Sequence, residues 1–285
     1  MTNKNKWLEE ITPKNKLLDL NLREVWQYRD LLILFVKRDV ITLYKQTILG
    51  PLWYVIQPLF TSVIFTLIFN KVAGISTGSI PPFLFMLAGV TTWNYFKECL
   101  TATSDTFKKN EQIFGKVYFP RIIMPLSIVI SNLLKFGIQF LIFIAFYIYY
   151  VFLGSDIKPT ILILGYPIVI VFMGLLGLGL GMIISSMVTK YRDLTFLVSF
   201  GVQLLMYISA VMYSISEIGD SLSQYKWLIE YNPLAVMIET SRVMLLGEGT
   251  INNFSLLITG VFTISTLIIG ILVFNKTEKT FIDTI

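Results

Sequence analysis

Charged and amide side chains interrupt several long apolar stretches of this 285-residue sequence. Lys97 and Glu98 stand near the end of one stretch, Lys135 lies deeper in the next, and Gln57 precedes Pro58 in the first. Ionisable groups at membrane depth are costly and usually have a reason, although Lys97 and Glu98 are placed to reach water. Lys135 either pairs with Glu98 or lines a wet space. Gln57 and Pro58 mark either a tolerated kink or a bend at the mouth of a pathway.

The motifs of enzyme active sites are missing from the sequence. There is no His, the commonest general base, and the single Cys99 has no partner for an internal disulfide. GEGT at 247–250 is too short for a phosphate-binding loop and lacks its Lys. No His/Cys cluster suits zinc, so we expect no catalytic residue, metal or cofactor on this chain.

The composition indicates that lipid is the solvent for much of the chain. Hydrophobic residues make up 55% of the sequence and charged residues only 14%, whereas soluble domains carry about a quarter charged residues. The net charge is +5, and we expect the excess in cytoplasmic loops rather than on nucleic acid. The N-terminus lacks the apolar core of a cleaved signal, so the first span should direct insertion.

Six segments are long and apolar enough to cross a bilayer as helices, which predicts an all-α integral membrane protein. Residues 216–253, between the last two segments, are less apolar and contain Asn232-Pro233, so we expect short re-entrant helices there. Residues 1–50 should form a cytoplasmic segment with an interfacial helix, and residues 51–285 the six-span domain. The spans are expected at 51–72, 82–104, 124–153, 160–187, 194–215 and 254–275.

Lys and Arg are distributed unevenly among the links between these spans. The N-terminal segment, the second and fourth links and the C-terminal tail are basic. The other links hold only Lys71, Lys158, Lys226 and Arg242. Because basic loops stay on the cytoplasmic side, we expect both termini there.

The segment 24–48 repeats apolar side chains at helical spacing, including Leu32, Phe35 and Val36, and interrupts them with charges. Such an amphipathic helix lies in the membrane interface with its apolar face down. It either only positions the first span or moves as a lever at the cytoplasmic mouth.

Small and aromatic residues are enriched in particular spans. Gly177 and Gly181 form a small-xxx-small face, for which close helix packing is favoured over a ligand site. Residues typical of the interfacial aromatic belts are Trp7, Trp26, Trp93 and Trp227. Rings in the first and fifth spans can stack on sugar faces, a weak signal by itself. They are Tyr54, Phe60, Phe65, Tyr207 and Tyr213.

Three motifs together resemble the membrane subunits of type-2 ABC exporters that move polysaccharides. RDVITLYKQTILGPLWYVIQPLF at 38–60 resembles the family's connection between the interfacial helix and the first span. KYRDL at 190–194 resembles its fourth-to-fifth link, and YNPLAVMIETSRVMLLGEG at 231–249 resembles its outer N-P-L segment. The family often has Pro where this chain has Ala210, which puts a kink there in doubt.

The resemblance implies a functional role for each motif. A cytoplasmic gate is implied at the first, where Gly50 permits a sharp turn and Pro51 suits the first turn of a helix. The gate residues are Arg38, Asp39, Tyr44, Lys45, Thr47, Gly50, Trp53, Gln57 and Pro58. An outer gate is implied at Asn232, Pro233, Glu239 and Arg242.

The resemblance also implies partners and a location. It implies a homodimer in the inner membrane of a bacterium, driven by a cytoplasmic ATPase dimer that binds ATP and Mg²⁺. The substrate would be a lipid-linked glycan such as O-antigen, capsule or teichoic acid. A permease for a drug or lipid is the first alternative, and a lipid-linked-sugar enzyme is less favoured.

The link 105–118 is implied to couple the ATPase to the spans, although it also reads as an ordinary basic loop. Its expected rim is Lys108, Lys109, Asn110 and Glu111, and its expected apolar anchors are Ile113 and Phe114. Arg192 and Asp193 in the fourth-to-fifth link are expected to contribute a second contact.

Overall fold

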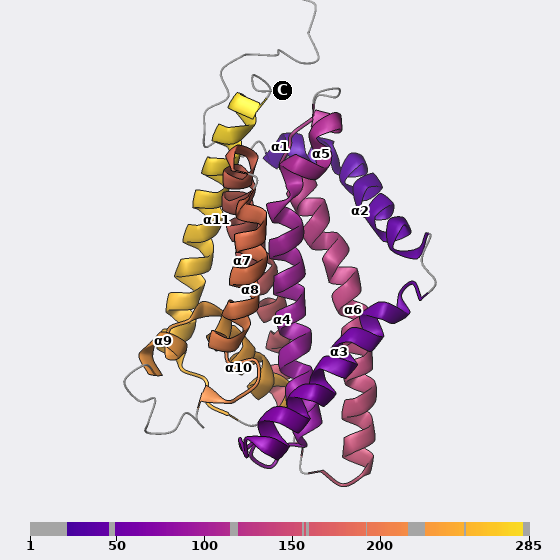
Figure 1. The fold of residues 1–285 in the computed structure, drawn as a ribbon, viewed down its shortest axis with the longest axis vertical. Helices are drawn as coiled ribbons and strands as arrows, with labels where there is room; N and C mark the ends of the chain where they lie inside the picture. Colours follow the sequence, from indigo (N-terminus) through magenta and orange to yellow (C-terminus); the bar gives the residue numbers. More distant parts are fainter. Residues whose placement is uncertain are drawn as a thin grey trace, which may run out of the picture.

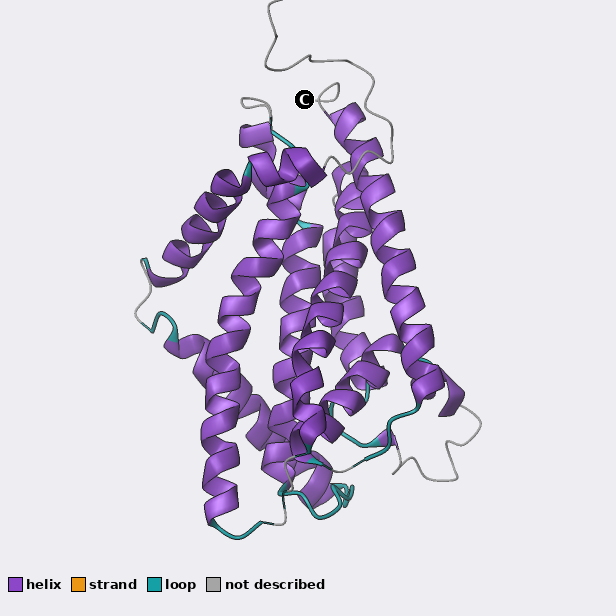
Figure 2. Cartoon of the chain, turned by 180° about the vertical axis from the view of Figure 1, so that it is seen from behind, coloured by secondary structure: helices purple, strands orange, loops and turns teal. Residues whose placement is uncertain are grey.

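The structure is a computed structural model, and it describes residues 22–45, 49–114, 119–155, 157, 160–191, 193–215, 226–247 and 249–281. These residues form helices and loops with no strand among them, as Figure 2 shows. Most of the long helices run lengthwise side by side, while α3 crosses obliquely in front of α4 and α2 slants away at one end (Figure 1).

Thirteen helical elements make up the described chain, and several are joined end to end. They are α1 (Leu22–Gln27), α2 (Arg29–Tyr44), α3 (Leu52–Phe65), the π-helical η1 (Thr66–Val72), α4 (Pro82–Ser104), α5 (Thr106–Phe114), α6 (Ile123–Phe152), the 3₁₀ helix η2 (Ile161–Gly165), α7 (Tyr166–Lys190), α8 (Leu194–Ile208), α9 (Lys226–Glu230), α10 (Pro233–Leu246) and α11 (Asn253–Phe281).

Four of the described helical segments are long and apolar enough to cross a membrane. They are Leu52–Val72, Ile123–Phe152, Ile161–Lys190 and Asn253–Glu278. The other two expected spans are also helical, but α4 is more polar, and α8 is a shorter apolar helix. Most residues of α4 are buried against α3, α6, α7 and α10, so this helix has little surface left for lipid. The expected fifth span at 194–215 is too long, because α8 ends at Ile208.

The centre of the fold depends on close approach between α7 and its neighbours α4 and α11. A Cβ atom at Gly177 would lie 2.8 Å from Cβ of Cys99, and one at Gly181 would lie 2.5 Å from Cβ of Thr103, both on α4. On the other side of α7, a Cβ at Gly270 would lie 2.5 Å from the carbonyl oxygen of Gly179. Only glycine permits such helix contacts, so the packing role predicted for this segment is confirmed.

Gly179→Ala should destabilise the fold because its Cβ would meet backbone atoms, which cannot rotate away. The new carbon would lie 2.9 Å from N and Cα of Leu267 on α11. Overpacking of this kind costs about 1–3 kcal/mol, so the thermal unfolding midpoint in detergent should fall. The matched control is Gly137→Ala on α6, where no heavy atom lies within 4 Å. That control should be neutral or slightly stabilising, and equal midpoints for both variants would contradict the packing account.

Candidate functional site

A groove of about 510 Å³ lies between α3, α4 and α8, and we call it the α3–α8 groove. Amides, hydroxyls and aromatic rings line it together, with Lys97 as its only charged lining residue. Its lining residues from α3 are Gln57, Thr61 and Phe65. Those from α4 are Val90, Trp93, Asn94, Lys97 and Thr101. Those from α8 are Ser199, Val202, Gln203, Met206 and Tyr207. Such a surface suits a neutral, hydroxyl-rich molecule that offers both apolar faces and hydrogen bonds.

The structure brings together only some of the rings expected along a substrate path. Phe65 and Tyr207 line the α3–α8 groove with Gln57. Tyr54 faces a different cavity, where its ring centroid lies 5.4 Å from Nζ of Lys135. Phe60 is 65% exposed and lines none of the described cavities. Tyr213 lies in the loop that follows α8, and its hydroxyl donates to the carbonyl oxygen of Tyr207 at 3.0 Å.

Two amides of the α3–α8 groove, Asn94 and Gln203, were not predicted from the sequence. Ser199, Gln203 and Tyr207 recur every four residues on α8, so helical spacing of polar residues in an apolar span was an available signal. Trp93 was expected in an interfacial belt, but it is 1% exposed and packs against Phe96. Its assignment was therefore wrong, because sequence position does not reveal which side of α4 faces the other helices.

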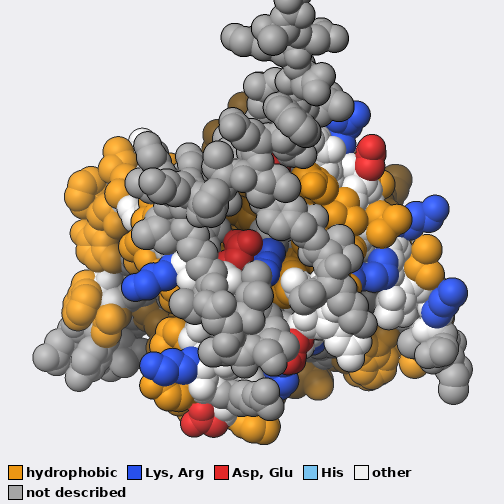
Figure 3. All heavy atoms as spheres, turned by 90° about the horizontal axis from the view of Figure 1, so that it is seen from above, with side chains coloured by type: hydrophobic (Ala, Val, Ile, Leu, Met, Phe, Trp, Pro, Cys, Tyr) orange, Lys and Arg blue, Asp and Glu red, His pale blue; other side chains and the backbone are white. Residues whose placement is uncertain are grey.

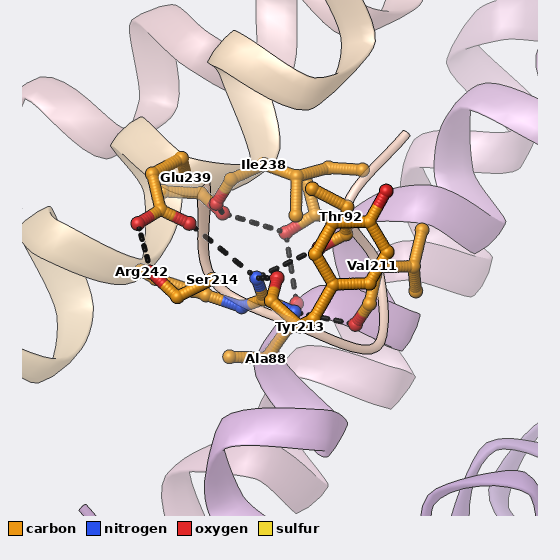
Figure 4. A network of polar contacts seen from close by, with 10 residues as sticks. Ala88, Thr92, Val211, Tyr213, Ser214, Ile238, Glu239 and Arg242 are labelled. Atoms are coloured by element: carbon orange, nitrogen blue, oxygen red, sulfur yellow. Dashed lines mark hydrogen bonds and ion pairs between the residues drawn. The ribbon is translucent and has the colours of Figure 1, made fainter. Parts of the chain in front are cut away.

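A buried Arg242 connects the end of α8 to α10 (Figure 4). Its Nη1 atom donates to the carbonyl oxygens of Ala210 at 2.8 Å and Tyr213 at 3.0 Å, and its Nη2 atom donates to that of Val211. Its guanidinium carbon lies 3.8 Å from the ring centroid of Phe85 on α4. Arg242 is 1% exposed, so the charge depends on these partners rather than on water.

Glu239 balances the charge of Arg242, and Ser214 holds the carboxylate of Glu239. Glu239 lies one turn earlier on α10, with Oε2 at 3.5 Å from Nη1 of Arg242. Ser214 donates from its hydroxyl to the other carboxylate oxygen of Glu239 at 2.7 Å. Gly89 on α4 leaves space for the guanidinium, because a Cβ there would lie 2.5 Å from Nη2. The sequence motifs did not indicate this contribution of Gly89 to the packing around Arg242.

The break after α8 explains why these donors are needed. Ala210 has φ 53°, the only positive value for a residue other than glycine in the described chain. The turn leaves carbonyl groups outside the helix, and buried carbonyls require donors. The sequence put a kink in doubt because Ala210 stands where the family often has Pro. The structure nevertheless breaks the helix after Ile208, through the left-handed backbone conformation of Ala210.

Asn232 and Pro233 join the same assembly at the start of α10. The side chain of Asn232 accepts from the backbone N–H of Leu234 at 3.0 Å and donates to the carbonyl oxygen of Ile208 at 3.2 Å. Pro233 occupies the first helical turn, where its missing donor costs nothing. The four residues expected at an outer gate therefore share one connection between α8 and α10.

The opposite end of the molecule carries α1 and α5 and is rich in Lys and Arg (Figure 3), and the first motif runs from α2 near this end into α3 (Figure 1). Arg38 pairs with Asp39 at 2.8 Å. Gly50 has φ 46°, in the left-handed region, and the chain turns there from α2 into α3. Among the other expected gate residues, Lys45 and Trp53 are exposed, Pro58 is buried inside α3, and Thr47 and the side chain of Tyr44 lie outside the described residues.

Helix α5 presents part of the expected coupling surface and buries the rest. Lys108, Lys109 and Glu111 are exposed, and Ile113 is half-buried. Asn110 is 7% exposed, so it does not form part of an exposed rim. Asp193 precedes α8, while Arg192 and residues 115–118 lie outside the described residues.

Phe114 was expected to insert into the ATPase, and this interpretation needs correction. The side chain is 4% exposed and packs between the rings of Phe107 and Phe119, at centroid distances of 5.7 and 5.9 Å. The guanidinium of Arg121 lies 5.2 Å from its centroid. Phe114 therefore anchors α5 to this chain's own core and offers no surface to a partner.

Replacing Arg242 should destabilise the fold far more than replacing an exposed cation. Arg242→Met leaves Glu239 charged and buried, which typically costs about 3–5 kcal/mol. Arg242→Lys should lose much of this too, because one ammonium cannot serve three carbonyls and a ring together. The double variant Arg242→Met with Glu239→Gln should recover part of the loss. Thermal unfolding in detergent measures each effect.

Lys226→Ala is the matched control for the Arg242 variants. Its pair with Glu230 spans 3.6 Å, but both side chains are about two-fifths exposed, so the change should cost less than about 1 kcal/mol. An Arg242→Met variant as stable as Lys226→Ala would show that the break after α8 does not depend on this guanidinium.

The sequence pattern of the family described as ABC-2 type transporter matches residues 30–246. The O-antigen export system permease protein RfbA of Klebsiella pneumoniae is 31% identical over 256 residues, 89% of this chain and 94% of that protein. A protein of the same name from Myxococcus xanthus is 27% identical over 217 residues, 76% of this chain and 80% of that protein. The polysialic acid transport protein KpsM of Escherichia coli is 23% identical over 249 residues, 85% of this chain and 91% of that protein. The resemblance carried by the three motifs is thus confirmed, and the chain belongs to the ABC-2 type transporter family.

Proposed function

We propose that this chain is the permease subunit of an ATP-driven exporter that moves a lipid-linked polysaccharide across the cytoplasmic membrane. The polysaccharide belongs to the O-antigen or capsule class, as the names of the relatives suggest. ATP and Mg²⁺ bind a separate cytoplasmic ATPase dimer, and two copies of this chain enclose the path. The chain itself contributes binding and movement, not chemistry.

The α3–α8 groove is the observation that carries this proposal. Aromatic faces stack on the apolar faces of sugars, while amides and hydroxyls exchange hydrogen bonds with their hydroxyl groups. Phe65 and Tyr207 supply the rings, and Gln57, Asn94 and Gln203 supply the amides. Several weak contacts of this kind hold a glycan without fixing its register, which is what a sliding polymer requires.

Exposed apolar surface beside the groove supports assembly of two copies. Val202 is the only buried residue of α8, and Phe196 and Phe200 on the same helix are 81% and 62% exposed. On α3, Phe60 is similarly exposed. Rings that lie outside the groove in one copy are available to close it from the second copy, so Phe60 keeps a place in the proposed path.

The proposed topology has six spans with both termini in the cytoplasm. Exposed Lys and Arg gather at the end that carries α2 and α5, which suits the cytoplasmic side. In this arrangement α2 lies at the interface, α5 contacts the ATPase, and α9 and α10 form re-entrant helices at the outer side. The Arg242 assembly then holds the outer end of the path.

Substitution of groove rings should reduce export without loss of the folded chain. Phe65→Leu and Tyr207→Leu keep apolar bulk but remove ring stacking worth on the order of 1 kcal/mol each. Surface glycan should fall several-fold for each variant while membrane levels of the chain stay normal. Phe262→Leu on α11 is the control, since that ring is exposed and no residue of α11 lines the groove. Wild-type export by both groove variants would refute a sugar-stacking role.

The exposed face of α5 should contact the ATPase. In a Cys99→Ser background, Glu111→Cys should cross-link to the ATPase, whereas Ser76→Cys in the loop between η1 and α4 should not. The start of α4 lies at the opposite end of that helix from α5 (Figure 1). Phe114→Ala should instead destabilise this chain by about 3–5 kcal/mol, because it opens a cavity in the core. No cross-link at Glu111 alongside an intact complex would place the coupling contact elsewhere.

A further inference from the structure

A second cavity, of about 370 Å³, lies between α2, α4, α5 and α6, and we call it the α2–α6 cavity. Its wall is dominated by polar side chains from three of these helices. The cations are Arg38, Lys109 and Lys135, and the only carboxylate in the lining is Asp39. The polar neutral residues are Thr42, Asn110, Ser131 and Asn132. None of the three sequence motifs accounts for the α6 residues.

The inner wall of this cavity is formed by one face of α6. Lys135 follows Asn132 by three residues and Ser131 by four, so it lies on the same side of the helix as both. Asn132 is 2% exposed, and its side-chain nitrogen makes no hydrogen bond to an oxygen or nitrogen in the described chain, so that only the weakly accepting sulfur of Cys99 is a partner for it. A buried amide without a strong acceptor costs stability, and it suits a site where a ligand supplies that acceptor.

The carboxylates hold the cations largely from outside the cavity. Lys135 lies 3.6 Å from Glu98 and Lys109 lies 3.2 Å from Asp105, and neither carboxylate lines the cavity. Arg38 pairs with Asp39 at 2.8 Å, within the lining. Each of the three cations therefore already has one carboxylate partner, but only Asp39 brings its negative charge into the lining of the cavity.

We infer that the α2–α6 cavity binds the phosphate or diphosphate headgroup of a lipid. The oxygen atoms of a phosphate act only as hydrogen-bond acceptors, and they match the donors of Arg38, Lys109 and Lys135. The hydroxyls of Thr42 and Ser131 already donate to backbone carbonyls of their own helices, so the cations and the amide of Asn132 carry the contact. Basic pockets between helices at the cytoplasmic side are a recurrent site for anionic headgroups. The inference rests on the proposed function in one respect, since it names the part of a lipid-linked substrate that this chain grips.

A continuous series of polar residues connects this cavity to the α3–α8 groove behind α3. A narrow cavity of about 20 Å³, enough for water, shares Asn132 and Lys135 with the α2–α6 cavity. It shares Gln57, Asn94 and Lys97 with the α3–α8 groove. Glu98 lies 3.6 Å from Lys135 and 3.9 Å from Lys97, between the two.

Binding of farnesyl diphosphate to the purified complex of this chain with its ATPase tests the inference. Native mass spectrometry in detergent should detect the bound lipid, and Lys135→Gln should weaken binding at least about tenfold, because a charge-assisted contact is lost. Lys135→Gln combined with Glu98→Gln should weaken it similarly without leaving an unpaired carboxylate. Lys37→Gln, an exposed cation next to Arg38 that lines none of the described cavities, should leave binding unchanged.

Competition identifies the source of the phosphate. Excess phosphatidylglycerol and inorganic pyrophosphate should each displace farnesyl diphosphate poorly. Equal competition by phosphatidylglycerol would assign the cavity to bulk membrane lipid, and equal competition by pyrophosphate would assign it to a free anion, and either result overturns the substrate headgroup. Wild-type binding by both Lys135 variants would overturn the site itself.

The export assay separates this inference from the proposed function. If the wild-type chain exports glycan and the Lys135→Gln variant binds the probe as well as the wild type does, the site is refuted and the proposed function stands. If the complex binds the probe through Lys135 but cells with the wild-type chain export no glycan, the proposed function is refuted and the site stands.

Discussion

The guanidinium of Arg242 satisfies backbone carbonyls that α8 leaves open where it ends at Ile208. A polypeptide inside a membrane protein cannot leave such groups unpaired, so a helix that stops short requires donors from elsewhere. Arg242 provides them from α10, and Glu239 and the ring of Phe85 balance its charge. This single side chain therefore links α8, α10 and α4 to one another.

The remainder of the fold divides into a tightly packed centre and a loosely attached side. Helices α4, α7 and α11 approach through Gly177, Gly181, Gly179 and Gly270, with no room for a methyl group. Helices α3 and α8 have mostly exposed surfaces by contrast. The α3–α8 groove lies at the boundary, with α4 as its firm wall and two less constrained helices as its sides.

Much of the helical framework was predictable because long apolar stretches and short motifs are local signals. The turn at Gly50 and the grouping of Asn232 with Arg242 followed from the same motifs. The orientation of Phe114 was not predictable, since its polar segment does not reveal that α5 turns this ring toward Phe107 and Phe119. Asn94 and Gln203 meet across the α3–α8 groove only through tertiary packing, which a spacing pattern within one helix cannot contain.

The peripheral position of α3 has an evolutionary consequence. In the most apolar 18-residue stretch of Leu52–Val72, only 11% of the residues are buried, so most substitutions there disturb few contacts within the chain. Stability resides mainly in the glycine-packed centre, where change is costly. Lineages can therefore alter the exposed residues of α3 while they keep the scaffold, so that the surface of this helix can diversify faster than the glycine-packed fold that carries it.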